Sequence, residues 1–469
     1  TVIVPFSKTP KEGAVLTEIR MDFADTQSGG ETVYVKSITF VKDKVDAVRL
    51  MGAELLHPGT ATVVIPGLTG EFKFLHVTDT HVSAFSDADQ KKWTATRIQY
   101  NTARRNSFMA AFEIKEKNIP FVGTFCTYTP TEIIQASGAI PVGLCSFSDE
   151  TIPDAEQDLP RNLCPLVKSS YGFAKTQKCP YFYFADLIVG ETTCDGKKKM
   201  YEMLGEIKDV YCMELPNRQS LMGRKLWREE VVALKNKLEE KFDVEITEEK
   251  IREQVRIMNK NRLALRRFYE LMKLDPPPMA GLNLYGVLYG SSFKFNKEKI
   301  ADEVNAVTER LKKEYEEGKC TIPKRPRIMV TGCPIGGAAM KVVKAIEDNG
   351  GNVVCYENCG GAKSVDELIN EEAEDIYQAI ADRYLNIGCS VMTPDDNRIK
   401  LMGRLLEEYK IDAVVEVVLQ ACHTYNVETY TIKKFVNDHN IPYMAIETDY
   451  STSDIGQLNT RCAAFIEML

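Results

Sequence analysis

The sequence predicts an α/β protein with two Rossmann-like, doubly wound parallel-sheet domains, a helical connector between them and a β-rich N-terminal extension. Two observations predict this class. Short apolar runs alternate with helical patterns after residue 106 and again after residue 323, which is typical of parallel sheets covered by helices. Between these stretches lies a charged segment with heptad-like apolar spacing. The predicted units are residues 1–100, 101–220, 221–322 and 323–469.

The extension and the first α/β domain are predicted from their strand signals. In the extension, three segments are rich in strand formers and are separated by Gly and Pro. In the first domain, short apolar runs predict buried strands, and Thr129-Pro130-Thr131-Glu132 has the spacing of a helix start. The strands expected in the extension are residues 32–40, 61–65 and 72–77. Those expected in the first domain are residues 120–125, 140–144 and 184–189.

The connector and the second α/β domain are predicted from periodicity. Apolar residues recur at helical spacing from Trp227 to Leu263, and three prolines after Asp275 end this segment because proline cannot continue a helix. After residue 323 apolar runs alternate with helical patterns. The expected strands are residues 327–331, 352–356, 413–419 and 443–447. The expected helices are residues 336–349, 374–385, 396–409, 427–438 and 455–468.

Composition excludes several classes of function. The chain has 469 residues and a net charge of -8, and nucleic-acid binding relies instead on clustered Lys and Arg. The basic run Lys197-Lys198-Lys199 is followed by Glu202, and we interpret it as a solvated helix face. No segment has the roughly 20 apolar residues that span a bilayer, and no signal-peptide pattern opens the chain. We therefore expect a cytoplasmic protein with no membrane or nucleic-acid partner.

Six of the thirteen cysteines fall where predicted strands end or predicted helices begin. In open α/β sheets, ligands bind outside the carboxyl ends of the strands. A thiol beside a helix N-terminus meets unpaired N–H donors, which favour the metal-binding thiolate. Any single cysteine can equally be a small buried hydrophobe, but six at such places indicate a site. The six are Cys126, Cys164, Cys333, Cys359, Cys389 and Cys422.

The spacing of the cysteines favours an iron–sulfur cluster over zinc. Structural zinc sites use closely spaced pairs, and the sequence has no Cys-x-x-Cys. Single cysteines from two domains suit a cluster held in the cleft between them. The nearest pair, Cys355 and Cys359, straddles a strand end, so Cys355 is expected to point into the sheet.

Three other motifs bear on function. The turn at residues 332–337 lacks the G-x-G-x-x-G spacing of dinucleotide sites. The chain has no G-x-x-x-x-G-K-[ST], so any dependence on ATP must come from a partner. Asp79-x-His81 resembles the first ligand pair of calcineurin-like phosphoesterases, but no G-N-H-[DE] element follows it. We expect a structural extension there rather than a second metal site.

Six long segments between residue 106 and the end of the chain carry most of the six cysteines and their surroundings. They are GTFCTYTPTEIIQASGAIPVGLCS (123–146), DLPRNLCPLVKSSYGF (158–173), KCPYFYFADLIVGETTCDGKKKMYE (178–202), TGCPIGGAAMKVV (331–343), YENCGGAK (356–363) and QACHTYNVE (420–428). These segments closely resemble the 2-hydroxyacyl-CoA dehydratase component family, and within it they look most like the branch of double-cubane cluster proteins. The first hundred residues depart from the family pattern.

The resemblance implies an iron–sulfur reductase that accepts low-potential electrons from an ATP-hydrolysing iron–sulfur activator and reduces a small-molecule substrate. In the double-cubane branch, two [4Fe-4S]-type units share a sulfide within one subunit of a homodimer. The alternative is a 2-hydroxyacyl-CoA dehydratase subunit with a single [4Fe-4S] cluster. Six cysteines exceed the need of one cubane and favour the first. A pure electron-transfer module without a substrate site is a further alternative.

The resemblance also implies ligands. Cys126, Cys164 and Cys422 match the motifs that supply the usual trio of the family. The predicted sheet places three more cysteines at the same cleft, and we assign these to a second trio. They are Cys333, Cys359 and Cys389.

Other residues have less specific roles. Cys145 and Cys194 also lie near strand ends and are the alternatives for any of the six. His423, beside Cys422, is a candidate proton donor or hydrogen-bond donor to the cluster. A helix-start histidine with purely structural contacts is the other interpretation. Glu428 and Glu447 follow strand ends or lie on the next helix and are further candidate proton donors.

Overall fold

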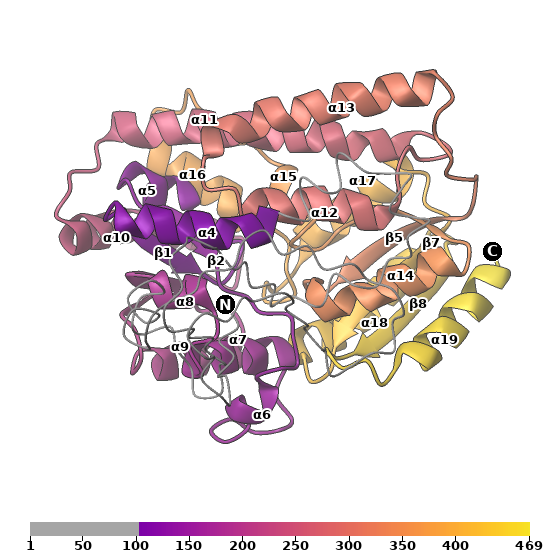
Figure 1. Cartoon of the computed structure of the whole chain (residues 1–469), viewed down its shortest axis with the longest axis horizontal. Coiled ribbons are helices and arrows are strands. Elements are labelled where there is room, and N and C mark those ends of the chain that lie inside the picture. Colours follow the sequence, from indigo (N-terminus) through magenta and orange to yellow (C-terminus); the bar gives the residue numbers. More distant parts are fainter. Residues whose placement is uncertain (1–102) are drawn as a thin grey trace, which may run out of the picture. The chain divides into compact units, whose positions relative to one another are not determined.

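The computed structural model describes residues 103–469 of the chain. The chain divides into two compact units, Thr1–Phe85 and Ser86–Leu469, and the described residues belong to the second. The strands predicted in the extension and the Asp79-x-His81 motif lie outside the described residues. Residues 103–469 contain two four-stranded, all-parallel sheets flanked by helices, which confirms the predicted α/β class (Figure 1).

The first sheet has the strand order β2-β1-β3-β4. The run predicted at residues 184–189 becomes a strand only from Leu187, because the aromatic segment before it forms a short helix. β4 is not predicted, since its four residues are mostly part-exposed and do not form an apolar run. The strands are β1 (Phe121–Thr124), β2 (Ile140–Gly143), β3 (Leu187–Glu191) and β4 (Val210–Met213). The helices are α4 (Ala103–Glu116), α5 (Thr131–Ala136), α6 (Ile152–Ala155), α7 (Pro165–Lys175), α8 (Pro180–Phe184) and α9 (Asp195–Leu204).

The helical connector packs on both domains. Ser220 caps its first helix by accepting a hydrogen bond from the N–H of Gly223. The apolar stripe predicted from spacing, which includes Trp227 and Val231, is buried. The first two connector helices contact α5 of the first domain, and they also contact helices of the second domain. The elements are α10 (Leu221–Phe242), α11 (Glu248–Glu270), η2 (Leu271–Lys273), α12 (Gly281–Ser292), η3 (Lys297–Lys299) and α13 (Ile300–Glu316).

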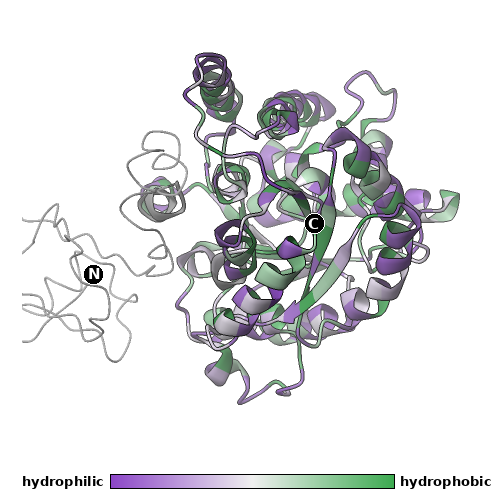
Figure 2. Cartoon of the chain, turned by 90° about the vertical axis from the view of Figure 1, so that its right-hand side faces the viewer, coloured by the Kyte–Doolittle hydropathy of each residue, from purple (hydrophilic) through white to green (hydrophobic). Residues whose placement is uncertain are grey.

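The second sheet has the strand order β6-β5-β7-β8, and all four predicted strands are present. Its apolar strands run between more polar helix surfaces (Figure 2). The helix predicted from residue 427 begins at His423, directly after Cys422. The strands are β5 (Arg327–Gly332), β6 (Asn352–Tyr356), β7 (Ala413–Leu419) and β8 (Tyr443–Thr448). The helices are η4 (Gly337–Met340), α14 (Lys341–Asp348), α15 (Ala362–Val365), α16 (Ile376–Leu385), α17 (Asp396–Glu408), α18 (His423–Asp438) and α19 (Ile455–Glu467).

A buried ion pair joins the two domains through the connector. Glu132 on α5 pairs with Arg262 on α11, and the hydroxyl of Tyr384 on α16 donates to Glu132 at 2.7 Å. Burial alone would raise the pKa of Glu132, but the Arg262 charge and the Tyr384 hydrogen bond outweigh it and hold this pKa below its ordinary value. Each of the three residues comes from a different part of the chain.

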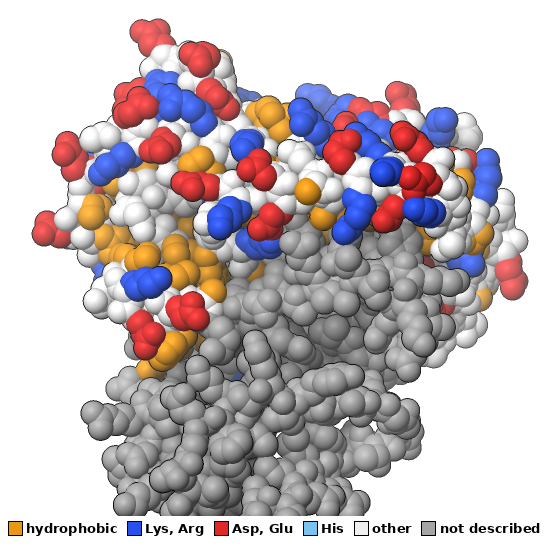
Figure 3. Space-filling view, turned by 45° about the horizontal axis from the view of Figure 1, so that its top comes forward, with side chains coloured by type: hydrophobic (Ala, Val, Ile, Leu, Met, Phe, Trp, Pro, Cys, Tyr) orange, Lys and Arg blue, Asp and Glu red, His pale blue; other side chains and the backbone are white. Residues whose placement is uncertain are grey.

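Charges of both signs are interspersed on the face that includes the long connector helices (Figure 3). Exposed ion pairs on the connector helices include Arg256 with Glu249 and Lys260 with Asp302. Among residues 103–469, no helix is long and apolar enough to cross a bilayer.

We expect Arg262→Ala to lower the free energy of unfolding by about 3–5 kcal/mol, because it leaves the buried Glu132 carboxylate unpaired. Arg256→Ala, on the same helix, removes only an exposed pair and should cost about 0–1 kcal/mol. Anaerobic urea unfolding of the two variants measures the difference. Equal losses would show that the buried pair does not stabilise the domain arrangement.

Candidate functional site

The candidate site lies where the carboxyl ends of the two sheets meet. Gly336 and Gly337 follow β5 and pack against Phe147, which follows β2. A Cβ atom at Gly336 would lie 2.9 Å from Cδ2 of that ring, so only glycine permits the approach. Beyond it, the Tyr128 hydroxyl of the first domain donates to the carbonyl oxygen of Ile387 in the second at 2.9 Å. The ends of both sheets are thereby held in contact.

All six predicted cysteines lie at this junction. Five of them follow a strand end or cap a helix, because a parallel sheet places its strand-to-helix turns at one edge. Cys126, Cys333 and Cys359 follow β1, β5 and β6. Cys164 caps α7, Cys422 caps α18 after β7, and Cys389 lies between α16 and α17.

The first group of thiols consists of Cys164, Cys333 and Cys422, which we call trio A. Hydrogen bonds from the thiols of Cys164 and Cys333 hold the pKa of Cys422 well below its ordinary value. The Leu419 N–H also donates to Cys333 Sγ at 3.3 Å. These hydrogen bonds stabilise the thiolate form of Cys422, and the thiolate is the form of cysteine that binds metals such as iron.

The second group consists of Cys126, Cys359 and Cys389, which we call trio B. Burial raises the pKa of the Cys126 thiol. The Lys197 charge lowers this pKa, whereas Glu191 and the neighbouring Cys359 and Cys389 raise it. Thr127, beside Cys126, places its hydroxyl 3.9 Å from Cys359 Sγ across the domain junction. Each trio thus draws on both domains. This grouping differs from the predicted one, which placed Cys126 with Cys164 and Cys422.

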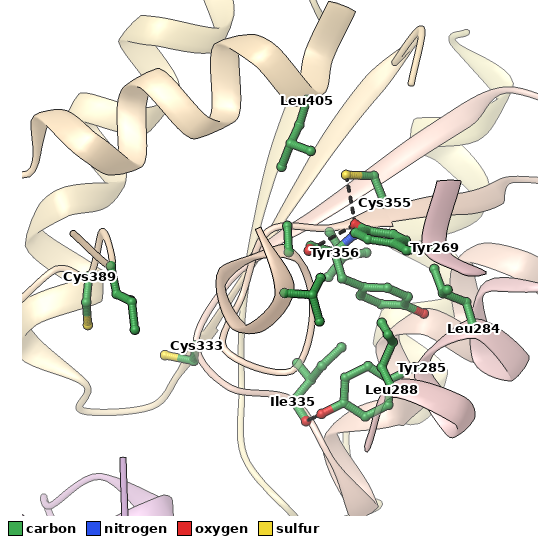
Figure 4. Packing of buried hydrophobic residues seen from close by; sticks show 14 of the residues in the cluster. Tyr269, Leu284, Tyr285, Leu288, Cys333, Ile335, Cys355, Tyr356, Cys389 and Leu405 are labelled. Atoms are coloured by element: carbon green, nitrogen blue, oxygen red, sulfur yellow. Dashed lines mark hydrogen bonds between the residues drawn. The ribbon is translucent and has the colours of Figure 1, made fainter. Parts of the chain in front are cut away.

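Side-chain direction separates these thiols from a core cysteine (Figure 4). The sulfur atoms of Cys333 and Cys389 point away from the tyrosine-lined packing around Tyr285. Cys355 points into that packing, as expected, where the Tyr269 hydroxyl donates to its sulfur at 3.2 Å.

Cys145, one of the two alternative cysteines, lies beside trio B. Cys145 donates to the carbonyl oxygen of Phe125 at 2.8 Å, and its sulfur is 4.0 Å from Lys197 Nζ. Cys194 caps α9, the helix that carries Lys197. Cys145 therefore remains an alternative ligand for trio B.

Lys197 corrects one interpretation of the sequence. It is not solvated: its side chain is buried, and Nζ donates to the carbonyl oxygen of Phe125 at 3.0 Å. Burial lowers its pKa, but the thiols of Cys145 and Cys126 and the Tyr201 hydroxyl outweigh this and raise it. Helical spacing could have revealed the position, because residues 197, 200, 201 and 204 share the buried face of α9.

A network of buried charges within the second domain lies beside Cys389. Arg398 is fully buried and donates to Glu416 at 3.0 Å and to Glu428. Lys363 pairs with Glu357 at 3.0 Å, and its Nζ lies 3.5 Å from the Tyr425 hydroxyl. That hydroxyl is 3.7 Å from Cys389 Sγ. Lys363, Tyr425 and Arg398 are absent from the sequence-based site because nothing local distinguishes them from other helix residues.

The predicted proton donors occupy different surroundings. His423 is exposed at the start of α18, and Glu447 is exposed on the edge strand β8. Within residues 103–469, neither side chain forms a hydrogen bond with a cysteine. Glu428 is held by Arg398. It adjoins Asp395, whose two carboxyl oxygens are buried without a hydrogen-bond partner in the described part of the chain.

No group of three or more His, Cys, Asp or Glu side chains in residues 103–469 is arranged to hold a single metal ion. The three thiols of a trio thus do not converge on one point in the described part of the chain.

Comparison with known proteins places the described region in context. The family model "2-hydroxyglutaryl-CoA dehydratase, D-component" matches residues 126–469, beginning at Cys126. The putative dehydratase subunit YjiM of Escherichia coli is 56% identical over 373 residues, which are 79% of this chain and 97% of that protein. The beta subunit of (R)-2-hydroxyglutaryl-CoA dehydratase of Acidaminococcus fermentans is 22% identical, covering 79% and 98%. A benzoyl-CoA reductase subunit of Thauera aromatica is 19% identical, covering 73% and 89%.

Asp395→Asn should change how stability depends on pH. Burial and the Glu428 carboxylate raise the pKa of Asp395 to about 8. The native state therefore keeps a proton that the unfolded chain releases above pH ~4, so stability falls by at most ~1.4 kcal/mol per pH unit up to the folded pKa. Relative to the wild type, the variant should therefore become more stable as the pH rises through this range. Urea unfolding at several pH values measures the difference.

The neighbouring Asp396 is exposed, so Asp396→Asn is the matched control and should follow the wild type. Parallel curves for all three proteins would exclude a raised Asp395 pKa.

Proposed function

The chain belongs to the 2-hydroxyglutaryl-CoA dehydratase D-component family, and from this membership we propose an iron–sulfur reductase with a double-cubane cluster between its domains. It accepts low-potential electrons from a separate ATP-hydrolysing iron–sulfur activator, acts on a small-molecule substrate, and forms a homodimer. One observation carries the proposal: six cysteines form two trios, and each trio draws on both domains.

The residues of the site fit such a cluster. Each cubane would take three thiolates, and trio A and trio B supply three each. Lys197 and Lys363 are buried cations beside trio B, and they would offset the negative charge of a thiolate-bound cluster. When bound, the cluster stores and delivers electrons at low potential.

The chain's own side chains would hold protons for a reduction. Asp395 keeps its proton near neutral pH. The Tyr425 hydroxyl lies between Lys363 and Cys389 and provides a polar contact at trio B. Glu428 is fixed as the partner of Arg398 and so acts on Asp395 as a neighbouring charge.

A second candidate is a 2-hydroxyacyl-CoA dehydratase subunit with a single [4Fe-4S] cluster. The names of the relatives favour it, since the 56% identical protein is a putative dehydratase subunit and another relative is a dehydratase beta subunit. The two candidates differ in how many trios bind iron.

Anaerobic iron and sulfide quantification tests the cluster. Two four-iron units correspond to about eight irons per chain. Cys333→Ala breaks trio A and Cys359→Ala breaks trio B, so both should lower the iron content sharply. Cys462→Ala is the matched control, because Cys462 is as buried as Cys333 and lies outside both trios. About four irons, unchanged in one of the two variants, would favour the single-cubane dehydratase.

Lys197→Met should make the midpoint potential of the cluster more negative, on the order of tens of millivolts, because a buried positive charge stabilises the reduced form. Lys199→Met, on the exposed side of the same helix, is the control and should leave the potential unchanged. A redox titration followed by electron paramagnetic resonance measures both. A more positive potential in Lys197→Met would contradict the assigned role of this lysine.

A further inference from the structure

A pocket of about 320 Å³ is lined by residues of α15, α16 and α17 and the segments that adjoin them, and it includes Lys363 of the buried charge network. This volume is within the range of small-ligand sites. Four of its lining residues are cationic and two are acidic, so positive charge is in excess. The cationic residues are Lys363, Arg383, Lys400 and Arg404, and the acidic residues are Asp366 and Glu367.

Arg383 is the unusual member of this set. It is only 5% exposed, yet no carboxylate of residues 103–469 lies within ion-pair distance of it. Its hydrogen bonds go to two backbone carbonyl oxygens, those of Ser364 at 2.8 Å and Glu367 at 3.3 Å. Buried charges are normally paired, because removing an ion from water costs several kcal/mol. Burial and the nearby Arg262 accordingly lower the pKa of Arg383 to about 10.

The other cations differ in how far they are neutralised. Arg404 pairs with Asp366, and Lys363 pairs with Glu357. Lys400 is exposed on α17, one turn before Arg404, and forms no ion pair within residues 103–469. Asn386 and Asn397 add side-chain amides to the lining. The pocket therefore offers one buried guanidinium and one exposed ammonium without a carboxylate partner in the described part of the chain.

We propose that this pocket binds a small oxyanion, the phosphate or carboxylate group of a ligand, with Arg383 and Lys400 as its charged contacts. A guanidinium presents a planar fork of donors that matches both groups. The lining includes Gly388, which directly precedes Cys389 of trio B in the chain. The proposal does not depend on the presence of a cluster, because the contacts are made by side chains of the pocket alone.

Isothermal titration of the full-length protein tests the site, with inorganic phosphate and succinate as probes and chloride as the reference anion. Saturable binding of either probe, tighter than chloride, is expected. Tighter phosphate binding identifies a phosphate-bearing ligand, and tighter succinate binding identifies a carboxylate. Lys400→Met should lower the affinity for the probe several-fold. Arg383→Lys keeps the charge but loses the planar fork of donors, and it should lower the affinity about tenfold.

Lys433→Met is the control, because Lys433 is exposed on α18 outside the pocket, and it should bind like the wild type. Lys400 is a surface residue, so its variant remains informative if Arg383→Lys fails to fold. Probes that bind no better than chloride would overturn the proposal. Equal binding by the wild type, Lys400→Met and Lys433→Met would overturn it as well.

Discussion

The close approach of Gly336 and Gly337 to Phe147 is the contact on which the rest of the site depends. It brings the turn after β5 against the turn after β2, so that the carboxyl ends of two separate sheets share one junction. At this junction Cys333 and Cys422 meet Cys164 of the first domain, and Cys126 meets Cys359 and Cys389 of the second. The connector helices, which contact both domains, and the buried Glu132–Arg262 pair also hold the two domains in this arrangement.

The junction also concentrates charge in a poorly solvated region. Lys197, Lys363 and Arg398 are buried, and each has polar or acidic neighbours. Such groups cost free energy unless they are paired. Lys363 and Arg398 have buried glutamate partners, whereas Lys197 contacts a carbonyl oxygen and a thiol. In trio A, the thiol pKa values are shifted mainly by burial and by hydrogen bonds among the three thiols. Trio B also has buried lysines beside it, so the two trios differ in their electrostatic surroundings.

Much of the fold follows from the sequence, whereas the details of the site do not. Buried strands such as β7, which is apolar except for Glu416, are predicted correctly, but β4 is short and partly exposed, so it carries no such signal. Strand ends place the cysteines at the correct edge of each sheet. Which thiols meet is decided by packing across the domain junction, so the neighbours of Cys126 in the structure differ from the predicted ones. Asp395 lies in a loop, where an acid is normally solvated, and only its burial distinguishes it.

The mixed origin of the trios has a consequence for biosynthesis. A chain emerging from the ribosome exposes Cys126 and Cys164 long before Cys389 and Cys422, and an N-terminal domain generally folds as soon as it is made. The thiols of Cys126 and Cys164 must then stay reduced at the carboxyl edge of the first sheet until the second domain is made. Trio B lacks Cys389 and trio A lacks Cys422 until much of the second domain has been synthesised, so a cofactor that needs a whole trio can be inserted only late in translation.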